Sequence, residues 1–310
     1  MKIIFVSGVK FGYELLEEIL KNDFEVSAVF SYNENKKSLY SDFASFDTLC
    51  ENYKIKNFHV NNINDVENIK TIKSLNPDII LVMGWSQLLK NEIIQIPKLG
   101  VVGSHPTELP KFRGRAPIPW TILKELTESA LTFFFIEEGI DNGDIVSQKK
   151  FKICENDDSE SIYDLIIKLG KNMIIETLKD FQNNSITRIP QNEKNFVEYW
   201  SKRTPDDGKI NWSKSAKDIS TLIRASTHPY PGAFTFFKNL PLKIFKASYV
   251  DDNTSNPGAI ISIDDKTVRI GTGNGSIYLK KIQYNSDIDI LPTKIITTED
   301  IGLFLNSDHT

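Results

Sequence analysis

The strongest constraint on the fold is an alternation of short apolar runs with segments of helical periodicity in the first half of the chain. Lys2 to Ser7 and Phe24 to Phe30 have the apolar, β-branched character of strands, and helical patterns follow them. Asp78 to Met83 (DIILVM) is a continuous apolar run, which is typical of a strand buried on both faces of a parallel sheet. We therefore predict an α/β fold with a parallel sheet and with ligand sites beyond the carboxyl ends of its strands.

The chain changes character near residue 195. A long helix is predicted over Ser159 to Phe181, and a polar, irregular stretch follows it. Beyond that stretch come one helix, Ser215 to Ser226, and several short β-runs punctuated by Gly, Asn and Asp. Such runs are typical of a small β-barrel or meander. We predict two domains, residues 1–195 and a smaller β-rich domain over residues 196–310.

The charge balance argues against a dominant nucleic-acid surface. The chain has 37 Lys and Arg against 41 Asp and Glu, a formal net charge of −4. Residues 201–310 hold fourteen basic and twelve acidic side chains, without a basic stripe. Any polyanionic partner would have to meet a local patch, so we expect no nucleic-acid partner.

Cysteine usage and hydropathy indicate the compartment. Cys50 and Cys154 are too isolated for a disulfide framework or a cysteine zinc site, which indicates a reducing compartment. No pair of histidines or cysteines has metal-ligand spacing, so we expect no metal. The N-terminal apolar run is broken at Ser7, Gly8 and Lys10, as expected of a strand and not of a signal peptide. No later run has membrane-spanning length, and we expect a cytoplasmic protein with no membrane partner.

Two glycine-bounded loops supply a histidine and a carboxylate. His105 lies in GVVGSHPTELPKFRGRAPIPW (residues 100–120), where four prolines fix the backbone, and Asp141 lies in EGIDNGD. A carboxylate can hold the tautomer of an imidazole and favour its charged form, so the pair predicts acid–base catalysis. In the purely structural interpretation, His105 caps a strand end and Asp141 closes a turn. Asp144 is the rival carboxylate, but its place at a strand start indicates a turn residue.

Other residues of these loops suit a ligand. Arg113 and Arg115 carry guanidinium groups that match phosphate oxygens, although a solvated pair of surface charges fits equally well. Gly114 between them allows a close approach of the backbone.

The glycines after the first strand, Gly8 and Gly12, do not meet the GxGxxG pattern of a dinucleotide site. Met83 and Trp85, at a strand end, could line a flat ligand or belong to the core.

The motifs GxxGSHPTELPKFRGRAPIPW and EEGIDNGDIV resemble those of the formyltransferases that use 10-formyltetrahydrofolate. MKIIFVSG, MGWSQLL, KRTPDDGKINW and IRASTHPYPGAF extend the likeness over most of the chain. The resemblance implies a Rossmann-like catalytic domain, a smaller OB-like or barrel-like C-terminal domain, and an amine as formyl acceptor.

The resemblance also implies roles for individual residues. His105 and Asp141 match the family's Asn-x-His and Asp, but the Asn position falls on Gly103, so another donor has to polarise the formyl oxygen. The Ser104 hydroxyl, a backbone N–H, a water molecule or a side chain from elsewhere are the alternatives. The implied folate site comprises Met83, Gly84, Trp85, Ser86, Gln87, Leu88, Ile140, Asn142 and Asp144. The implied acceptor site comprises Gly8, Lys10, Ser104, Pro106, Thr107, Arg113, Gly114, Arg115 and Arg224.

RGRAPIPW and RTPDDGKINW look more like the sugar-nucleotide branch of this family than the tRNA branch. The expected acceptor is a UDP- or dTDP-linked amino sugar, such as a 4-amino-4,6-dideoxyhexose for surface glycan, with its diphosphate on Arg113, Arg115 or Arg224. Two alternatives stay open: a methionyl-tRNA formyltransferase, or a folate or nucleotide-sugar binding protein without catalysis, because of Gly103. An exposed apolar face in the C-terminal part could serve a homodimer.

Overall fold

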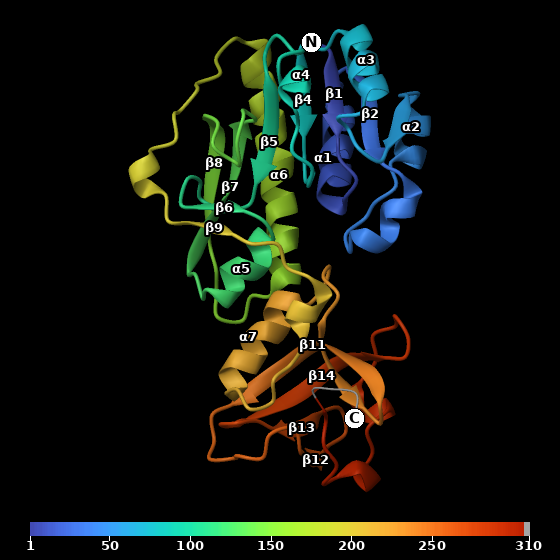
Figure 1. Cartoon of the computed structure of the whole chain (residues 1–310), viewed down its shortest axis with the longest axis vertical. Helices are drawn as coiled ribbons and strands as arrows, with labels where there is room; N and C mark the ends of the chain where they lie inside the picture. The colour runs from blue at the N-terminus through green and yellow to red at the C-terminus, as the bar shows by residue number, and fades with distance from the viewer. Residues whose placement is uncertain (307–310) are drawn as a thin grey trace. The chain divides into compact units, whose positions relative to one another are not determined.

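The computed structural model describes residues 1–306, so the last four residues of the expected C-terminal domain lie outside it. The chain forms two compact units (Figure 1). The N-terminal unit comprises Met1–Pro117, Thr127–Cys154 and Tyr163–Ser201. The C-terminal unit comprises 118–126, 155–162 and the chain from Lys202 onward. The chain therefore passes between the units several times, whereas the sequence suggested a single boundary near residue 195.

A seven-stranded sheet forms the centre of the N-terminal unit, in the order β3-β2-β1-β4-β5-β7-β8. Its strands are β1 (Ile3–Val6), β2 (Val26–Tyr32), β3 (Asn57–Val60), β4 (Ile79–Val82), β5 (Val101–His105), β7 (Glu128–Phe135) and β8 (Ile145–Lys152). The first five are parallel, but β7 runs antiparallel to both β5 and β8. The predicted parallel sheet is thus confirmed for these five strands, and β7 and β8 extend it into a mixed sheet. The short EGIDNGD connection between β7 and β8 permits only an antiparallel pair.

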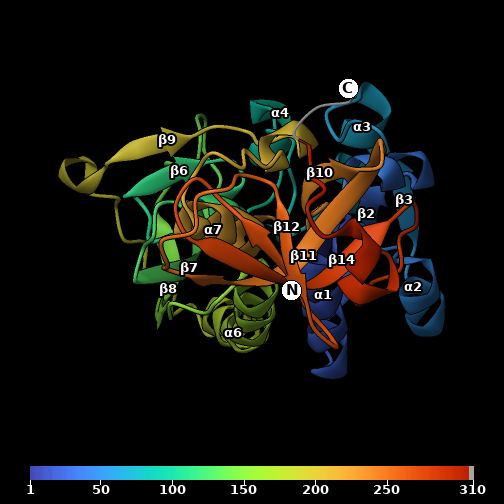
Figure 2. The same cartoon turned by 90° about the horizontal axis from the view of Figure 1, so that it is seen from below.

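Helices cover both faces of this sheet, because its central strands are apolar on both sides (Figure 2). The helices are α1 (Lys10–Lys21), α2 (Asp47–Tyr53), α3 (Val66–Leu75), α4 (Asn91–Ile94) and α6 (Ser159–Gln182). Ile72 of α3 and Ile93 of α4 pack with alternate strand residues such as Ile4 and Ile80. On the opposite face α1 and α6 lie so close that a Cβ at Gly170 would stand 2.9 Å from the Phe11 ring. The arrangement is the predicted Rossmann-like fold.

The C-terminal unit contains a five-stranded antiparallel sheet, in the order β10-β11-β14-β13-β12. Its elements are α7 (Ala216–Ser226), β10 (Ala233–Phe237), β11 (Leu240–Val250), β12 (Ile260–Ile263), β13 (Val268–Gly271) and β14 (Ser276–Tyr284), and α5 (Pro117–Leu123) also belongs largely to this unit. The side chain of Ser215 caps α7 by accepting from the N–H of Asp218. Residues 303–306 hydrogen-bond to Phe236 in edge strand β10 and to Ile260 in edge strand β12, which closes the sheet in a barrel-like manner.

A small parallel sheet next to the proline-rich loop was not anticipated from the sequence. It joins β6 (Phe112–Gly114) to β9 (Glu198–Trp200), two segments that lie side by side in Figure 1. A Cβ at Gly114, where φ is +109°, would collide with the carbonyl oxygen of Trp200. Glycine is therefore required at this point of contact.

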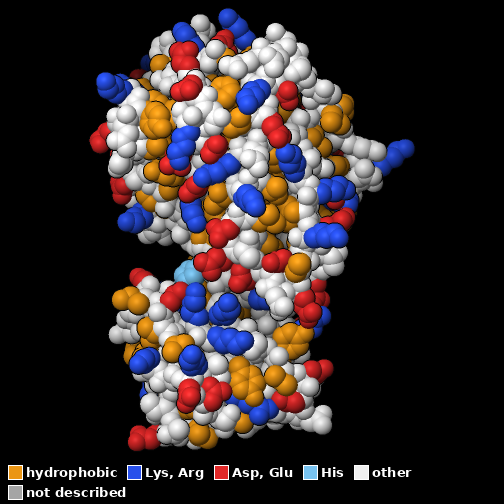
Figure 3. Space-filling view, turned by 180° about the vertical axis from the view of Figure 1, so that it is seen from behind, with side chains coloured by type: hydrophobic (Ala, Val, Ile, Leu, Met, Phe, Trp, Pro, Cys, Tyr) orange, Lys and Arg blue, Asp and Glu red, His pale blue; other side chains and the backbone are white. Residues whose placement is uncertain are grey.

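The surface carries charges of both signs. On the face shown in Figure 3, Lys and Arg side chains lie among Asp and Glu side chains and form no continuous basic stripe. No helix within residues 1–306 combines the length and the apolar character that are needed to cross a bilayer.

Candidate active site

His105 ends β5 with its side chain almost fully enclosed, at 5% exposure. Its Nε2 lies 3.1 Å from the carbonyl oxygen of Phe112, which also accepts from the Thr107 hydroxyl. Because a carbonyl oxygen can only accept, Nε2 carries the proton in the neutral form of the imidazole, and Nδ1 then presents a lone pair. The loop is fixed in turn by Thr132 of β7, whose hydroxyl donates to the Thr107 carbonyl at 2.6 Å.

Asp141 lies in the β7–β8 loop with φ +51°, a left-handed conformation that aspartate tolerates better than most residues. Its Oδ2 accepts from the backbone N–H of Gly114 at 2.9 Å. The flanking glycines are needed, since Gly139 has φ +119° and a Cβ at Gly143 would clash with the Phe135 carbonyl oxygen. The sequence thus folds this loop so that its carboxylate meets the proline-rich loop.

The structure brings the two groups together, with Nδ1 of His105 3.8 Å from Oδ2 of Asp141. Their side chains are 7% and 20% exposed, so the carboxylate acts on the imidazole with little screening by water. The separation is too long for a direct hydrogen bond. It leaves Nδ1 available to a third group, with a negative charge beside it that stabilises the imidazolium after proton transfer.

The position of the missing Asn is filled by apolar side chains. A Cβ at Gly103 would stand 2.9 Å from both Cγ1 and Cδ1 of Ile136 and 3.5 Å from the Phe134 ring. Ser104, one of the suggested replacements, accepts from the N–H of Gly84 at 3.4 Å. Glycine at 103 therefore does not open a space for a new polar side chain, because Ile136 occupies it.

The structure separates the three candidate phosphate-binding arginines. Arg113 is 3% exposed and its guanidinium binds Gln191 and Glu193, which corrects the expectation that it meets a ligand. Arg224 belongs to the C-terminal unit and donates to the Asp157 carbonyl oxygen at 2.7 Å. Arg115 is exposed, and within residues 1–306 its side chain makes no hydrogen bond or ion pair.

The residues at the start of α1 are already engaged by protein groups. The N–H of Lys10 donates to the Asp42 carbonyl oxygen at 2.8 Å, and the N–H of Phe11 donates to the Tyr163 hydroxyl at 3.0 Å. A Cβ at Gly8 would overlap the Tyr32 ring. These contacts correct the expectation that Gly8 binds substrate. The side chain of Lys10 is half exposed, with its Nζ 3.5 Å from Asp164, and its contact with substrate stays a prediction.

In the segment that follows β4, some side chains are buried or hydrogen-bonded within the protein and others are exposed. Met83 is fully buried, and Gln87 is bound to Ile63 N–H and to the Asn61 carbonyl oxygen. Leu88, in contrast, is 65% exposed. The side chains of Met83 and Gln87 are therefore already engaged by the protein, whereas that of Leu88 is open to solvent.

An aromatic stack accompanies this segment. The Trp85 ring stacks on Tyr32 at 3.8 Å between centroids, and Tyr32 stacks on Tyr40 at 4.3 Å. Both tyrosine hydroxyls hydrogen-bond Ser86 Oγ. Burial raises the pKa of the Tyr32 hydroxyl, which therefore stays protonated at neutral pH. The indole Nε1 of Trp85 is buried without a hydrogen-bond partner among the described residues.

The Asp141 loop also contains both exposed side chains and side chains that are engaged by the protein. Ile140 is 44% exposed, while the Asn142 amide donates to the Glu138 carbonyl oxygen of its own loop. Asp144 is held by Arg188 Nε at 2.9 Å, so its assignment to the folate site is corrected to a structural ion pair. Gln191 lies in the stretch that the sequence indicated as irregular, and it was not anticipated as part of the site. Its amide binds the carbonyl oxygens of Asp141 and Gly143.

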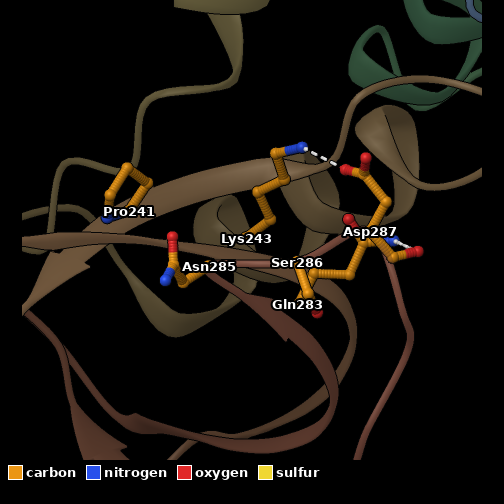
Figure 4. A pocket seen from close by; sticks show the side chains of 6 residues that line it. All are labelled: Pro241, Lys243, Gln283, Asn285, Ser286 and Asp287. Atoms are coloured by element: carbon orange, nitrogen blue, oxygen red, sulfur yellow. Dashed lines mark hydrogen bonds and ion pairs between the residues drawn. The ribbon is translucent and has the colours of Figure 1, made fainter.

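Two other features of the described chain bear on ligand binding. Within residues 1–306, no group of three or more His, Cys, Asp or Glu side chains is arranged to hold a metal ion. A surface hollow exists in the C-terminal unit, between the ends of β11 and β14 (Figure 4). Its one lysine, Lys243, faces Asp287 at 3.5 Å. The hollow contains none of the predicted site residues, and we assign it no role in the chemistry.

Comparison with known families decides the class. The formyl transferase family model matches residues 1–178, and the formyl transferase C-terminal domain model matches residues 202–294. The chain belongs to the formyl transferase family. The family-level prediction is thus confirmed: the chain is a formyl-transfer enzyme, and its formyl donor is 10-formyltetrahydrofolate.

Individual relatives differ in the molecules that their names and structures mention. The chain is 32% identical over 291 residues to the methionyl-tRNA formyltransferase of Clostridium tetani, covering 92% of this chain and 93% of the relative. It shares its fold with the N-formyltransferase of Helicobacter canadensis solved with folinic acid and dTDP-3-aminofucose (TM-score 0.68, 23% identity, 90% and 99% covered). It also shares its fold with HypX of Aquifex aeolicus solved with tetrahydrofolic acid (TM-score 0.68, 19% identity, 95% of this chain), of which it spans 46%.

The first prediction concerns the formyltransferase pair. We expect His105→Ala and Asp141→Asn each to lower kcat by a factor on the order of a hundred or more, because each removes a part of the proton-transfer unit. Nucleotide affinity should change little. Steady-state kinetics and calorimetric binding measure both quantities, and wild-type turnover in both variants would contradict these roles.

The second prediction concerns position 103. Gly103→Asn should destabilise the fold because the new side chain overlaps Ile136. The double variant Gly103→Asn/Ile136→Ala should lose less free energy of unfolding than the two single variants together, since the amide occupies the vacated space. Urea denaturation of the four proteins tests this coupling, and additive losses would show that Ile136 does not occupy the Asn position.

Proposed function

We propose that this enzyme transfers the formyl group to the amine of a nucleotide-linked amino sugar, such as a 4-amino-4,6-dideoxyhexose destined for surface glycan. The observations that carry the proposal are the His105–Asp141 pair and an exposed arginine, Arg115, on the loop that holds this pair together. Arg115 directly follows Gly114, the residue whose N–H holds Asp141. In a nucleotide sugar the pyranose ring separates the diphosphate from the amine, so a cation near the proton-accepting pair suits such a substrate.

The chemistry follows from the hydrogen bonds of His105. The donor supplies a formyl group, and transfer forms a carbon–nitrogen bond at the acceptor amine, which then loses a proton. With Nε2 held by the Phe112 carbonyl oxygen, Nδ1 of His105 is the atom that accepts this proton. Asp141 favours the imidazolium that results, and the proton leaves with the departing nitrogen of the donor.

We place the donor against the exposed apolar side chains of Leu88 and Ile140, one on each of two loops of the N-terminal unit. Ligand sites are lined mostly by apolar side chains, and the rings of a folate offer apolar faces that fit such side chains.

Charge supports a small acceptor over tRNA. A tRNA-binding domain would be expected to carry a basic surface, but residues 201–310 hold fourteen basic and twelve acidic side chains. The fold likeness to the Helicobacter canadensis enzyme is in line with a dTDP-sugar acceptor. The second candidate, tRNA-directed formylation, is favoured by the 32% identity to a methionyl-tRNA formyltransferase.

The third prediction decides between these acceptors. Purified protein with 10-formyltetrahydrofolate should add the mass of one formyl group to a UDP- or dTDP-linked amino sugar, measured by mass spectrometry. Charged initiator tRNA should remain unformylated under the same conditions, and filter binding should show no salt-dependent complex. Formylation of the tRNA and of no sugar would overturn the proposal, and tight binding of a nucleotide sugar without product would favour a non-catalytic binding protein.

The fourth prediction concerns Arg115. Arg115→Ala should raise KM for the nucleotide sugar on the order of tenfold, because it removes a charge-assisted contact to the diphosphate, while kcat changes little. Lys149→Ala is the matched control, since it removes an exposed cation of the same unit that pairs with Glu176. Equal KM values in both variants would show that the diphosphate binds elsewhere.

A further inference from the structure

Residues 189–200 form a strap across both catalytic loops, although their sequence has no regular pattern. Ile189 pairs with Ile145 at the start of β8, and at the other end β9 pairs with β6. We propose that Gln191, in the middle of this strap, is a positioning residue that holds the Asp141 loop against the His105 loop. The inference rests on the proposed roles of His105 and Asp141 in formyl transfer.

Gln191 uses both ends of its amide. Its Nε2 donates to the carbonyl oxygens of Asp141 and Gly143, each at 2.8 Å. Its Oε1 accepts from Arg113 Nη2 at 2.8 Å and from Arg113 Nε at 3.3 Å. A single side chain therefore links the backbone of the second catalytic loop to a side chain of the first.

The residues on either side of Arg113 hold the catalytic groups themselves. The carbonyl oxygen of Phe112 binds His105 Nε2, and the N–H of Gly114 binds Asp141 Oδ2. A shift of Arg113 therefore moves the anchors of both groups. Gln191 closes this ring of contacts by tying Arg113 to the backbone of Asp141.

Glu193 completes the attachment of Arg113 to the strap. Its carboxylate forms an ion pair with the Arg113 guanidinium, with 2.5 Å between Nη2 and Oε1. The hydrogen bond from Arg113 holds the pKa of Glu193 below its usual range, so the pair stays ionised at neutral pH. With its charge neutralised inside the protein, Arg113 serves structure and not ligand binding.

The Asp141 loop needs such an external restraint. Asp141 and Gly139 both have positive φ, and glycine at 139 and 143 gives the loop more conformational freedom than other residues would. The carboxylate stands only 3.8 Å from the imidazole, and misplacement by about 1 Å can cost a hundredfold in rate. Loss of Gln191 should therefore slow the chemical step without removing a group that touches the substrate.

Gln191→Glu is the sharpest variant, because it keeps the size of the side chain and the acceptor for Arg113 but removes both donors to the Asp141 loop. Gln191→Ala removes all of these contacts. Lys194→Ala, an exposed residue of the same strap, is the matched control. We expect kcat to fall on the order of ten- to a hundredfold in both Gln191 variants and to stay at the wild-type value in Lys194→Ala, with KM for both substrates nearly unchanged.

A second comparison separates positioning from a general structural role. In the Asp141→Asn background, Gln191→Glu should lower kcat no further, because it acts through a carboxylate that is already absent. Hydrogen exchange of the peptide covering residues 138–144 should be faster in Gln191→Glu than in the wild type or in Lys194→Ala, while the core strands keep their protection.

Wild-type kcat in Gln191→Glu, a further loss of kcat in the Asp141→Asn background, or unchanged exchange of residues 138–144 would each overturn the inference. The kinetic test uses whichever acceptor the wild-type enzyme formylates. Formylation of tRNA in place of a sugar would therefore overturn the proposed acceptor and leave this test intact. If no acceptor is found, the exchange measurement alone decides whether Gln191 restrains the loop.

Discussion

The proposed active site depends on three consecutive residues whose backbone hydrogen-bonds the side chains of both His105 and Asp141. Phe112 offers its carbonyl oxygen to the His105 imidazole, and two residues later Gly114 offers its N–H to the Asp141 carboxylate. A short parallel pairing with β9 holds this tripeptide in place, and only glycine fits at its end. The distance between imidazole and carboxylate is therefore set by backbone hydrogen bonds and not by direct contact of the two groups.

The strands of the N-terminal unit determine where the His105 and Asp141 side chains lie. His105 stands at the carboxyl end of a strand in the parallel part of the sheet, where ligand sites of α/β proteins are found. Asp141 lies in the loop of the hairpin formed by β7 and β8, which extends the sheet beyond β5. Because β7 is paired to β5 residue by residue, Thr132 lies opposite His105 and anchors its loop. The hairpin of β7 and β8 therefore provides both Asp141 and the anchor of the His105 loop.

Local pattern was sufficient to predict some features of the protein. The uninterrupted apolar run over residues 78–83 marked a central strand, and the glycine- and proline-rich loops marked His105 and Asp141, because backbone constraints leave a direct trace in the residue types. The short loop between β7 and β8 indicates their antiparallel pairing, but the direction of β7 relative to β5 is not visible in the residue types, since ALTFFF would suit a parallel strand equally well. The engagement of Arg113 by Gln191 and that of Asp144 by Arg188 join residues 78 and 44 positions apart, so no local signal indicates them.

The departure at position 103 shows how the site differs from the family pattern. The resemblance implies an Asn at this position, where this chain has Gly103, and the side chain of Ile136 lies where the Cβ of such a residue would stand. If the proposed site is correct, the formyl oxygen is stabilised by a donor other than an amide at position 103.

The central claim is that His105 and Asp141 act as one unit, and a double-mutant cycle in single-turnover rates tests it most directly. If the two groups move the same proton, the protein carrying both His105→Ala and Asp141→Asn should react no more slowly than the slower single variant. Losses that multiply, so that the double variant is slower by the product of the two single effects, would show that the groups act independently and would contradict the account.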